Sequence, residues 1–195
     1  MPRTEEQYEL IRENKKQLIM DTALELFANE GYFTTSIGKI AERAGIAKGL
    51  IYNYFDSKEE LIKEIMLTGI DQLFESLDPN KDGILTDEEF VYFINTSFRI
   101  IDEKRDFYRL YFSVMFHPHV FTLLYEKLMD FMPVLNAILV PFFKRKGIED
   151  PEGEVLFFGA ILDGLGMNHI SNPDSFPLDK LKKRIFKLYN IEIKE

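Results

Sequence analysis

Cysteine is absent from all 195 residues of the sequence. The protein can therefore form no disulfide, use no thiolate nucleophile and hold no metal through sulfur, a composition that suits a reducing compartment. The sequence also lacks the ~20-residue hydrophobic run that a membrane-spanning helix needs, and it lacks a signal-peptide pattern. These absences predict a cytoplasmic protein with no membrane partner.

Signals of catalysis are missing as well. The sequence has no glycine-rich phosphate loop, and its three histidines are not spaced like members of a catalytic triad. His117 and His119 flank Pro118, and residues two apart do not share a face of a helix, so we expect a turn there rather than a metal site. We expect no enzymatic activity and no catalytic residues.

Helical periodicity runs through most of the chain, whereas alternating strand patterns are hardly present. The chain is 46 % hydrophobic, so it can bury a sizeable core. The predicted fold class is all-α. The first predicted helix ends at Gly31, and the later ones cover residues 58–77, 87–103, 105–116, 118–130, 132–146, 152–170 and 178–189.

Two short helical segments joined by a glycine turn lie between Thr35 and Phe55. Apolar residues recur at helical spacing from Ile37, and Gly45 ends the first segment. The second segment opens at Lys48 and leaves polar side chains on its outer face. This pattern is typical of a helix-turn-helix, whose second helix enters the major groove of DNA.

The residues around this turn resemble the TetR family of transcriptional regulators. The resemblance is carried by LELFANEGY at 24–32, FTTSI at 33–37, AGI at 44–46, KG at 48–49, YF at 54–55 and SKEEL at 57–61. Ala47 departs from the family, which usually has a Ser or Thr cap worth about 1 kcal/mol there. The resemblance implies a DNA-binding domain over residues 1–56 and a helical domain for effector binding and dimerisation over residues 57–195.

The residues that we expect to meet DNA carry exposed polar or aromatic groups on the two short helices and at helix starts. Lys48 is placed for a base edge or a phosphate, and Gly49 would let the DNA approach the backbone closely. A tyrosine can pack its ring while its hydroxyl reaches a phosphate. Taken singly, each residue could be only a cap or a solvated side chain. The predicted set is Thr35, Ser36, Lys48, Gly49, Tyr52, Asn53, Tyr54 and Lys58.

Net charge fits this function least well, because the chain carries −9 and many nucleic-acid-binding domains are basic. Between residues 36 and 58, however, cations outnumber carboxylates. A basic tip on an acidic body would orient the protein on DNA, with low non-specific affinity and steep sensitivity to salt. The cations of this basic tip are Lys39, Arg43, Lys48 and Lys58.

A second motif occupies residues 78–89, DPNKDGILTDEE, which fit the EF-hand calcium loop D-x-[DN]-x-[DN]-G-x₅-E. Ca²⁺ prefers oxygen ligands, and a single hand with three carboxylates is expected to bind at about 10⁻⁵ to 10⁻³ M. The alternative is an ordinary surface turn before a helix whose first turn favours carboxylates. The predicted ligands are Asp78, Asn80, Asp82, the carbonyl of Ile84, Thr86 directly or through water, and Glu89.

Aromatic and methionine side chains are dense between residues 97 and 145. Most such residues are core residues, but apolar pockets between bundled helices also bind small molecules. The family resemblance implies such a pocket, and an apolar or aromatic effector is the natural expectation. The candidate lining is Phe98, Tyr108, Tyr111, Phe112, Met115, Phe116, Tyr125 and Met132.

The C-terminal segments 154–167 and 178–189 resemble the dimerisation end of the same family. A dimer would present two reading helices to a palindromic operator with half-sites about 34–36 Å apart, or a multiple of that spacing. The same helices could instead pack only within one chain. The predicted interface is Phe157, Phe158, Ile161, Leu165, Ile185 and Leu188.

Together these features predict a homodimeric DNA-binding regulator, a repressor released by a small apolar effector. Calcium at the EF-hand-like loop would modulate it or act as a structural clamp. The alternative hypothesis is a calcium sensor or buffer that acts through protein partners and has no operator.

Overall fold

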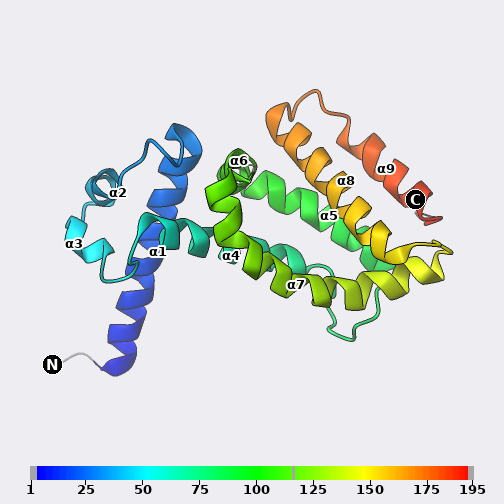
Figure 1. Ribbon diagram of the computed structural model, residues 1–195, viewed down its shortest axis with the longest axis horizontal. Helices are drawn as coiled ribbons and strands as arrows, with labels where there is room; N and C mark the ends of the chain where they lie inside the picture. Colours follow the sequence, from blue (N-terminus) through cyan, green and yellow to red (C-terminus); the bar gives the residue numbers. More distant parts are fainter. Residues whose placement is uncertain (1–3, 116, 193–195) are drawn as a thin grey trace. The chain divides into compact units, whose positions relative to one another are not determined.

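The computed structural model describes residues 4–115 and 117–192, without the side chains of residues 70–72, 74, 119, 123–124 and 126–128. Over these residues the chain forms nine α-helices and no strand, which confirms the all-α prediction (Figure 1). The helices are α1 (Glu5–Glu30), α2 (Ile37–Arg43), α3 (Lys48–Ile51), α4 (Lys58–Glu75), α5 (Asp87–Glu103), α6 (Arg105–Val114), α7 (Pro118–Arg145), α8 (Pro151–Ser171) and α9 (Leu178–Leu188).

The chain divides into two compact units. The first contains the chain up to Thr68 together with Arg109–Leu124, and the second contains Gly69–Tyr108 and the chain from Tyr125 onward. The boundaries fall within α4, α6 and α7. The predicted division after residue 56 therefore lies inside the first unit.

Local signals fix the helix-turn-helix of the first unit. The hydroxyl of Ser36 caps α2 by accepting the backbone N–H of Lys39 at 3.2 Å. Gly45 has φ +65°, a conformation that glycine adopts without steric cost, and it turns the chain between α2 and α3. Ala47 caps α3 with no side-chain hydrogen bond, as expected from the missing Ser or Thr.

The core of the first unit holds α2 and α3 in place. Ile40 of α2 and Ile51 of α3 are completely buried, and so are Ile19 of α1 and Leu61 of α4. Burying such a side chain contributes about 1.5–3 kcal/mol relative to leaving it exposed. The apolar faces of the two short helices are thus buried in the core, and their polar faces are exposed to solvent.

An aromatic cluster forms the core of the second unit. The ring of Phe90 in α5 lies 4.8 Å from Phe142, 5.2 Å from Phe158 and 5.4 Å from Tyr189 between ring centroids. The Tyr189 hydroxyl donates to a carboxylate oxygen of Glu154 at 2.7 Å. Burial, and then the hydrogen bond and charge of Glu154, raise the pKa of Tyr189 above its ordinary value. The hydroxyl therefore stays protonated and ties the end of α9 to α8.

Helix α7 corrects one sequence prediction. We expected separate helices over 118–130 and 132–146, but Pro118–Arg145 is one helix with Pro133 and Pro141 inside it. Each proline lacks an N–H and so removes one backbone hydrogen bond of the helix. The 28-residue helix nevertheless continues through both prolines to Arg145.

Gly69→Ala should destabilise the protein. Gly69 in α4 is buried, and a Cβ at this position would overlap the ring of Phe107, which is itself buried. Because overpacking a filled core usually costs about 1–3 kcal/mol, we expect the midpoint of urea unfolding to fall at an unchanged m-value. Gly159→Ala in α8 is the matched control, since a Cβ there meets open space. An equal loss in both variants would contradict this prediction.

Candidate functional site

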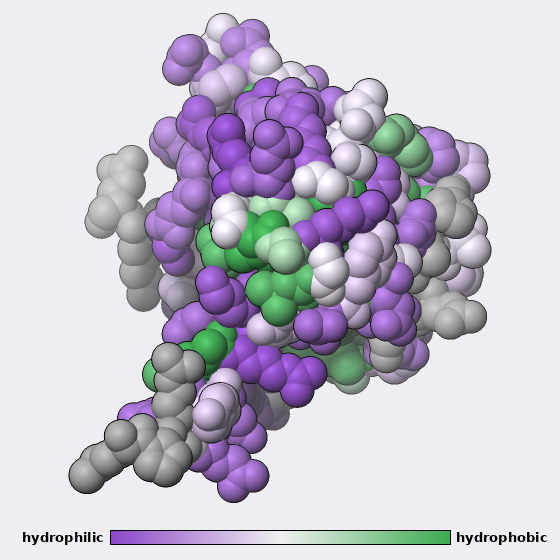
Figure 2. Space-filling model, turned by 90° about the vertical axis from the view of Figure 1, so that its left-hand side faces the viewer, coloured by the Kyte–Doolittle hydropathy of each residue, from purple (hydrophilic) through white to green (hydrophobic). Residues whose placement is uncertain are grey.

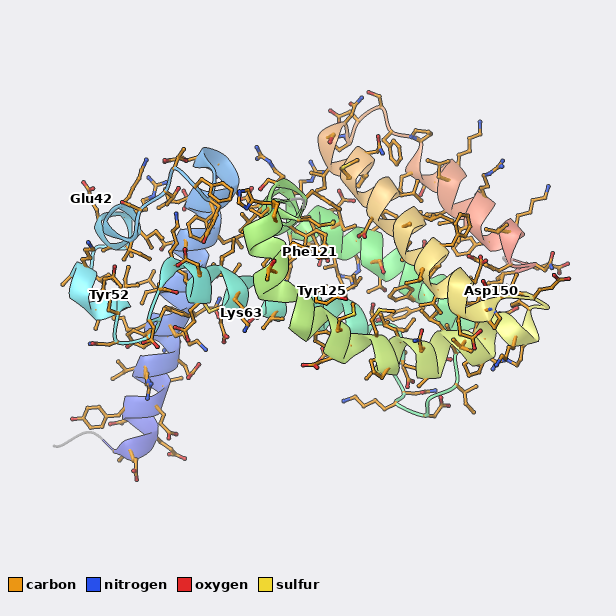
Figure 3. The ribbon with its side chains drawn as sticks, in the orientation of Figure 1. Glu42, Tyr52, Lys63, Phe121, Tyr125 and Asp150 are labelled. Atoms are coloured by element: carbon orange, nitrogen blue, oxygen red, sulfur yellow. The ribbon has the colours of Figure 1, made fainter. Side chains whose placement is uncertain are left out.

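The second short helix and the residues after it present a polar and aromatic surface. Lys48, Gly49, Tyr52 and Asn53 are exposed, and the ring of Tyr52 is 46 % accessible. Figure 3 labels Tyr52 at the end of α3 and Glu42 beside α2. The face of the protein that includes these helices is mostly hydrophilic around a smaller hydrophobic patch (Figure 2). We call these four exposed residues, Lys48, Gly49, Tyr52 and Asn53, the reading surface.

Tyr54, another predicted DNA contact, is half-buried rather than exposed. It lines a shallow hollow of about 310 Å³ beside α1, together with Glu9, Arg12, Glu13 and Lys16. Its side chain therefore lies beside α1, and the exposed residues Lys48, Gly49, Tyr52 and Asn53 are better placed to meet a large ligand.

Two predicted phosphate contacts have structural partners inside the chain. The side chain of Thr35 is only 1 % accessible, and its hydroxyl donates to the Gly31 carbonyl at 2.9 Å. The Lys58 ammonium donates to the carbonyls of Tyr32 at 2.9 Å and Thr35 at 3.1 Å, and it lies 4.4 Å from the centre of the Tyr32 ring. These contacts do not support phosphate binding by the two side chains, because both are already hydrogen-bonded. Ser36 is exposed but serves as the α2 cap.

The four cations of the basic tip differ in whether they already have a partner within the chain. Lys39 pairs with Glu30 and Arg43 pairs with Glu25, so α1 carboxylates neutralise both. Lys58 is held by carbonyl groups. Over the part of the chain that the structure describes, Lys48 is the one cation of this tip without a hydrogen-bonding or ion-pair partner, and it lies at the start of α3. The positive charge available to an external anion is therefore concentrated at the reading surface.

The sequence did not predict one aromatic contact in the first unit, between Phe33 and His117. Phe33, which follows α1, lies against the ring of His117 just before α7, with 4.1 Å between ring centroids. The Nδ1 atom of His117 is shielded from solvent and has no hydrogen-bond partner. His117 lies between α6 and α7, but the turn that we expected around Pro118 is not there, because Pro118 and His119 are the first residues of α7. The packing partner of His117 could not be found from local spacing.

The loop from Asp78 to Glu89 joins α4 to α5. The backbone N–H of Gly83 donates to Asp78 Oδ2 at 2.9 Å, and Gly83 has φ +75°. Thr86 and Glu89 form a reciprocal capping box at the start of α5. Among the described residues, no three His, Asp or Glu side chains lie close enough together to hold a metal ion in this conformation. Calcium binding by this loop stays a prediction.

The predicted effector residues belong to both compact units, and Phe116 lies outside the described residues. Phe98 and Tyr108 are buried, and burial raises the pKa of Tyr108 to about 12. Tyr125, in contrast, is exposed. The predicted set divides into Phe98, Tyr108, Tyr125 and Met132 in the second unit and Tyr111, Phe112 and Met115 in the first. The effector pocket stays a prediction.

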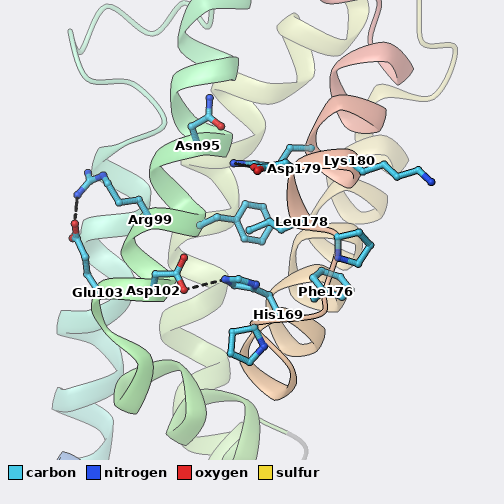
Figure 4. Close-up of a pocket in the computed structure, with 13 residues that line it drawn as sticks. Asn95, Arg99, Asp102, Glu103, His169, Phe176, Leu178, Asp179 and Lys180 are labelled. Carbon is cyan, nitrogen blue, oxygen red and sulfur yellow. Dashed lines mark hydrogen bonds and ion pairs between the residues drawn. The ribbon is translucent and has the colours of Figure 1, made fainter.

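One open cleft of about 670 Å³ lies in the second unit between α5, the end of α8 and the start of α9 (Figure 4). His169 Nε2 lies 3.0 Å from Asp102 Oδ1 across this cleft, and Arg99 pairs with Glu103 at its edge. Of the predicted effector residues that the structure describes, Phe98 alone lines it. Its charged walls do not match the apolar pocket that we expected.

An apolar groove of about 500 Å³ runs between α8 and α9. Phe157, Ile161 and Leu165 line it from α8, and Ile185 and Leu188 line it from α9. These five are predicted interface residues, so the structure brings them together at one groove, although Ile185 is itself only 4 % accessible and forms the floor of the groove rather than an exposed contact. We call this surface the α8–α9 groove.

The prediction that Phe158, the sixth residue of the set, belongs to the interface is wrong. Its side chain is 2 % accessible and packs into the aromatic cluster, 5.8 Å from the ring of Phe143. Successive helical residues point about 100° apart, so Phe157 and Phe158 serve different faces of α8. Phe158 is a core residue and is not available to a partner.

Residues 19–65 match the family model described as bacterial regulatory proteins, tetR family. Among curated proteins, the HTH-type transcriptional repressor KstR2 of Rhodococcus jostii is 33 % identical over 104 residues, or 51 % of this chain and 50 % of the relative. The fatty acid metabolism regulator protein of Bacillus subtilis is 31 % identical over 88 residues, or 45 % of each chain. This chain spans about half the length of these curated relatives.

Solved structures extend the likeness over the whole fold. FadR of Bacillus halodurans, a fatty acid degradation regulator, superposes with a TM-score of 0.71 at 22 % identity, covering 90 % of this chain and 94 % of that one. FadR of Bacillus subtilis in complex with stearoyl-CoA superposes with a TM-score of 0.67 at 22 % identity, covering 91 % and 99 %. Identities this low establish a shared fold. Within the described residues, no helix is long and apolar enough to cross a membrane.

Proposed function

We propose that this protein is a TetR-type transcriptional regulator that binds DNA as a homodimer and is released by a small apolar effector. The observation that carries the proposal is the reading surface. The apolar residues of α2 and α3 are buried, while Lys48, Gly49, Tyr52 and Asn53 remain outside on the helix that should enter the major groove. The family match covers this same segment.

Relatives with established names support a regulatory rather than an enzymatic function. The matching segment belongs to proteins described as transcriptional regulators or repressors. The absence of a phosphate loop and of a triad-like spacing in the sequence agrees with this reading. Repression is the mode that the repressor among the relatives suggests.

The α8–α9 groove supports the homodimer. It exposes Phe157 and Leu188, each about half accessible, on two neighbouring helices. A two-fold axis beside the groove would place the same helices of a second copy against it, giving a self-complementary interface. Two reading surfaces on one particle then match the two halves of a palindromic operator.

The effector part of the proposal rests on the fold. The solved FadR of Bacillus subtilis holds stearoyl-CoA, so long-chain acyl-CoA, which joins an apolar acyl chain to a charged coenzyme A group, is the effector class that we would test first. An effector releases DNA only if it binds the DNA-incompetent conformation more tightly than the competent one. Helix α4 begins in the first unit at Lys58 and ends in the second at Glu75, so it can carry such a difference along the chain.

Selection of bound sites from random duplex DNA tests the proposal. We expect a palindrome to be enriched, and binding to it should weaken as salt rises because Lys and Arg contacts release counterions from the phosphates. Titration of the selected site with stearoyl-CoA, and with free CoA as the control, tests the effector class. Failure to enrich any duplex at low ionic strength would remove the DNA-binding function, whereas failure of acyl-CoA alone would remove only that effector.

Gly49→Ala should weaken DNA binding without harming the fold. Apart from the adjoining residues and the backbone of its own helix, nothing lies within 4 Å of a Cβ placed at Gly49, so packing inside the chain does not require glycine here. If DNA approaches this backbone, the added methyl will cost about 1–2 kcal/mol of binding, or roughly tenfold in affinity. Fluorescence anisotropy with the selected operator measures the loss, and thermal unfolding should be unchanged or slightly improved. Unchanged operator affinity would contradict the close approach.

A further inference from the structure

The EF-hand-like loop is the motif that the proposed function leaves unused. Helix α4 ends at Glu75, shortly before the first loop position, and α5 begins at Asp87, the tenth position. Gly83, at the sixth position, has the positive φ that the sharp turn of a calcium loop requires. The helix–loop–helix frame of the motif is thus present in addition to its ligand residues.

The carboxylate of Asp78 carries an observation independent of the motif. Its Oδ2 accepts the Gly83 N–H from across the loop, so the group faces the loop interior. Its Oδ1 is shielded from solvent and has no hydrogen-bond partner. A carboxylate oxygen that is shielded from water and has no partner costs free energy, and a cation is the partner that would best remove this cost.

The amide of Asn80 occupies the space between two other carboxylates. Its Nδ2 donates to Asp82 Oδ2 at 3.0 Å and to Glu89 Oε1 at 2.9 Å. One neutral NH₂ group thus holds together two negative groups that would otherwise repel each other. The hydrogens of this NH₂ group carry only partial positive charges. A bound cation would place full positive charge between the same two carboxylates.

We propose that Ca²⁺ binds within this loop by taking the place of the Asn80 amide hydrogens. The amide turns its oxygen inward, and the ion is held by Asp78, Asn80, Asp82 and Glu89 together with the Ile84 carbonyl and Thr86. This all-oxygen set on a flexible loop suits Ca²⁺ better than Mg²⁺, which demands strict octahedral geometry. The site does not depend on the proposed DNA-binding function.

Two contacts connect the loop to the end of α7. Arg145 Nη2 donates to the Leu85 carbonyl at 2.5 Å, and Lys146 Nζ lies 2.6 Å from Asp87 Oδ2. Leu85 itself is buried in the same unit. An ion that rigidifies the loop therefore fixes the end of α4, the start of α5 and the end of α7 at once, which makes it a structural clamp of the second unit.

Calorimetric titration of the metal-free full-length protein with CaCl₂ tests the site. We expect one ion per chain with a Kd of about 10⁻⁵ to 10⁻³ M, and markedly weaker binding of Mg²⁺. About 10 mM Ca²⁺ should raise the melting temperature by roughly 5 °C over the EGTA-treated protein, because the ion binds only the folded loop. Absence of both binding heat and a melting shift in the wild-type protein would overturn the proposal.

Glu89→Gln and Glu88→Gln form a matched pair. Glutamine at position 89 keeps the capping box but loses the bidentate carboxylate, so we expect at least about a tenfold loss of Ca²⁺ affinity. Glu88 is exposed in the first turn of α5 and is not a predicted ligand, so Glu88→Gln should bind Ca²⁺ like the wild type. Equal Ca²⁺ affinities of the two variants would place the ion elsewhere and overturn the assignment.

Discussion

With Phe157→Asp and Leu188→Asp introduced together, the protein becomes a monomer, and its affinity for operator DNA falls by about 10²- to 10⁴-fold. Both side chains line the α8–α9 groove and are 52 % and 50 % accessible in the single chain. Aspartate there costs little folding energy, but burying two carboxylates in a symmetric apolar interface is prohibitive. Loss of the second reading surface removes the gain from bivalent binding, which sets the size of the effect.

The control is Tyr8→Asp together with Leu10→Asp in α1. These side chains are 58 % and 63 % accessible, so the chemical change is matched, but they lie far along the sequence from the groove. Sedimentation velocity should report a dimer for the control and a monomer for the groove variant. A groove variant that remains dimeric would place the interface elsewhere, and a monomer with full operator affinity would refute the bivalent model.

The double substitution Lys48→Ala and Tyr52→Ala should abolish specific binding while leaving the dimer intact. Each contact to a base edge or a phosphate is worth about 1–3 kcal/mol, so the pair should lower operator affinity by roughly 10²- to 10³-fold per reading surface. Lys48 lacks a partner within the described chain and Tyr52 is exposed, so neither change should disturb the core. Anisotropy titrations at several salt concentrations measure both affinity and salt slope.

Lys63→Ala together with Tyr92→Ala is the matched control for this experiment. Tyr92 is 49 % accessible in α5, close to the 46 % of Tyr52, and Lys63 in α4 lies outside the reading surface. Loss of Lys48 should lower the salt slope by about 1 for each phosphate contact that is removed, whereas loss of Lys63 should not. Equal losses in both double variants would mean that bulk charge, rather than the reading surface, governs binding.

Sequence periodicity predicted elements whose signals are local. Helix α5 spans Asp87–Glu103 as expected, because the Thr86 and Glu89 capping box marks its start. The start of α2 at Ser36 and the turn at Gly45 follow from cap and glycine chemistry in the same way. Pro133 was misleading, because we expected the chain to break before it, whereas Pro141 was expected within a helix and lies in one. A proline disfavours a helix without forbidding one that is long enough to hold it.

The candidate site was predictable in position but not in the use of each side chain. A pattern shows that Thr35 and Lys58 are polar residues near helix starts, and it cannot show that Gly31, Tyr32 and Thr35 carbonyls lie within their reach. These partners depend on how α1, α2 and α4 pack together. Phe158 poses the same problem, because an apolar residue on α8 fits an interface and a core equally well until the neighbouring rings are known.

Glu89 has two competing tasks. In the structure its Oε2 accepts the Thr86 backbone N–H at 2.9 Å and the Thr86 hydroxyl at 2.8 Å, which stabilises the first turn of α5. A metal ion that recruits this carboxylate draws on the same oxygen lone pairs. Stronger capping by Glu89 therefore weakens its binding of the ion, and stronger ion binding weakens the cap. A substitution at residue 86 would change the strength of the cap, and with it the ion affinity, without replacing a charged ligand.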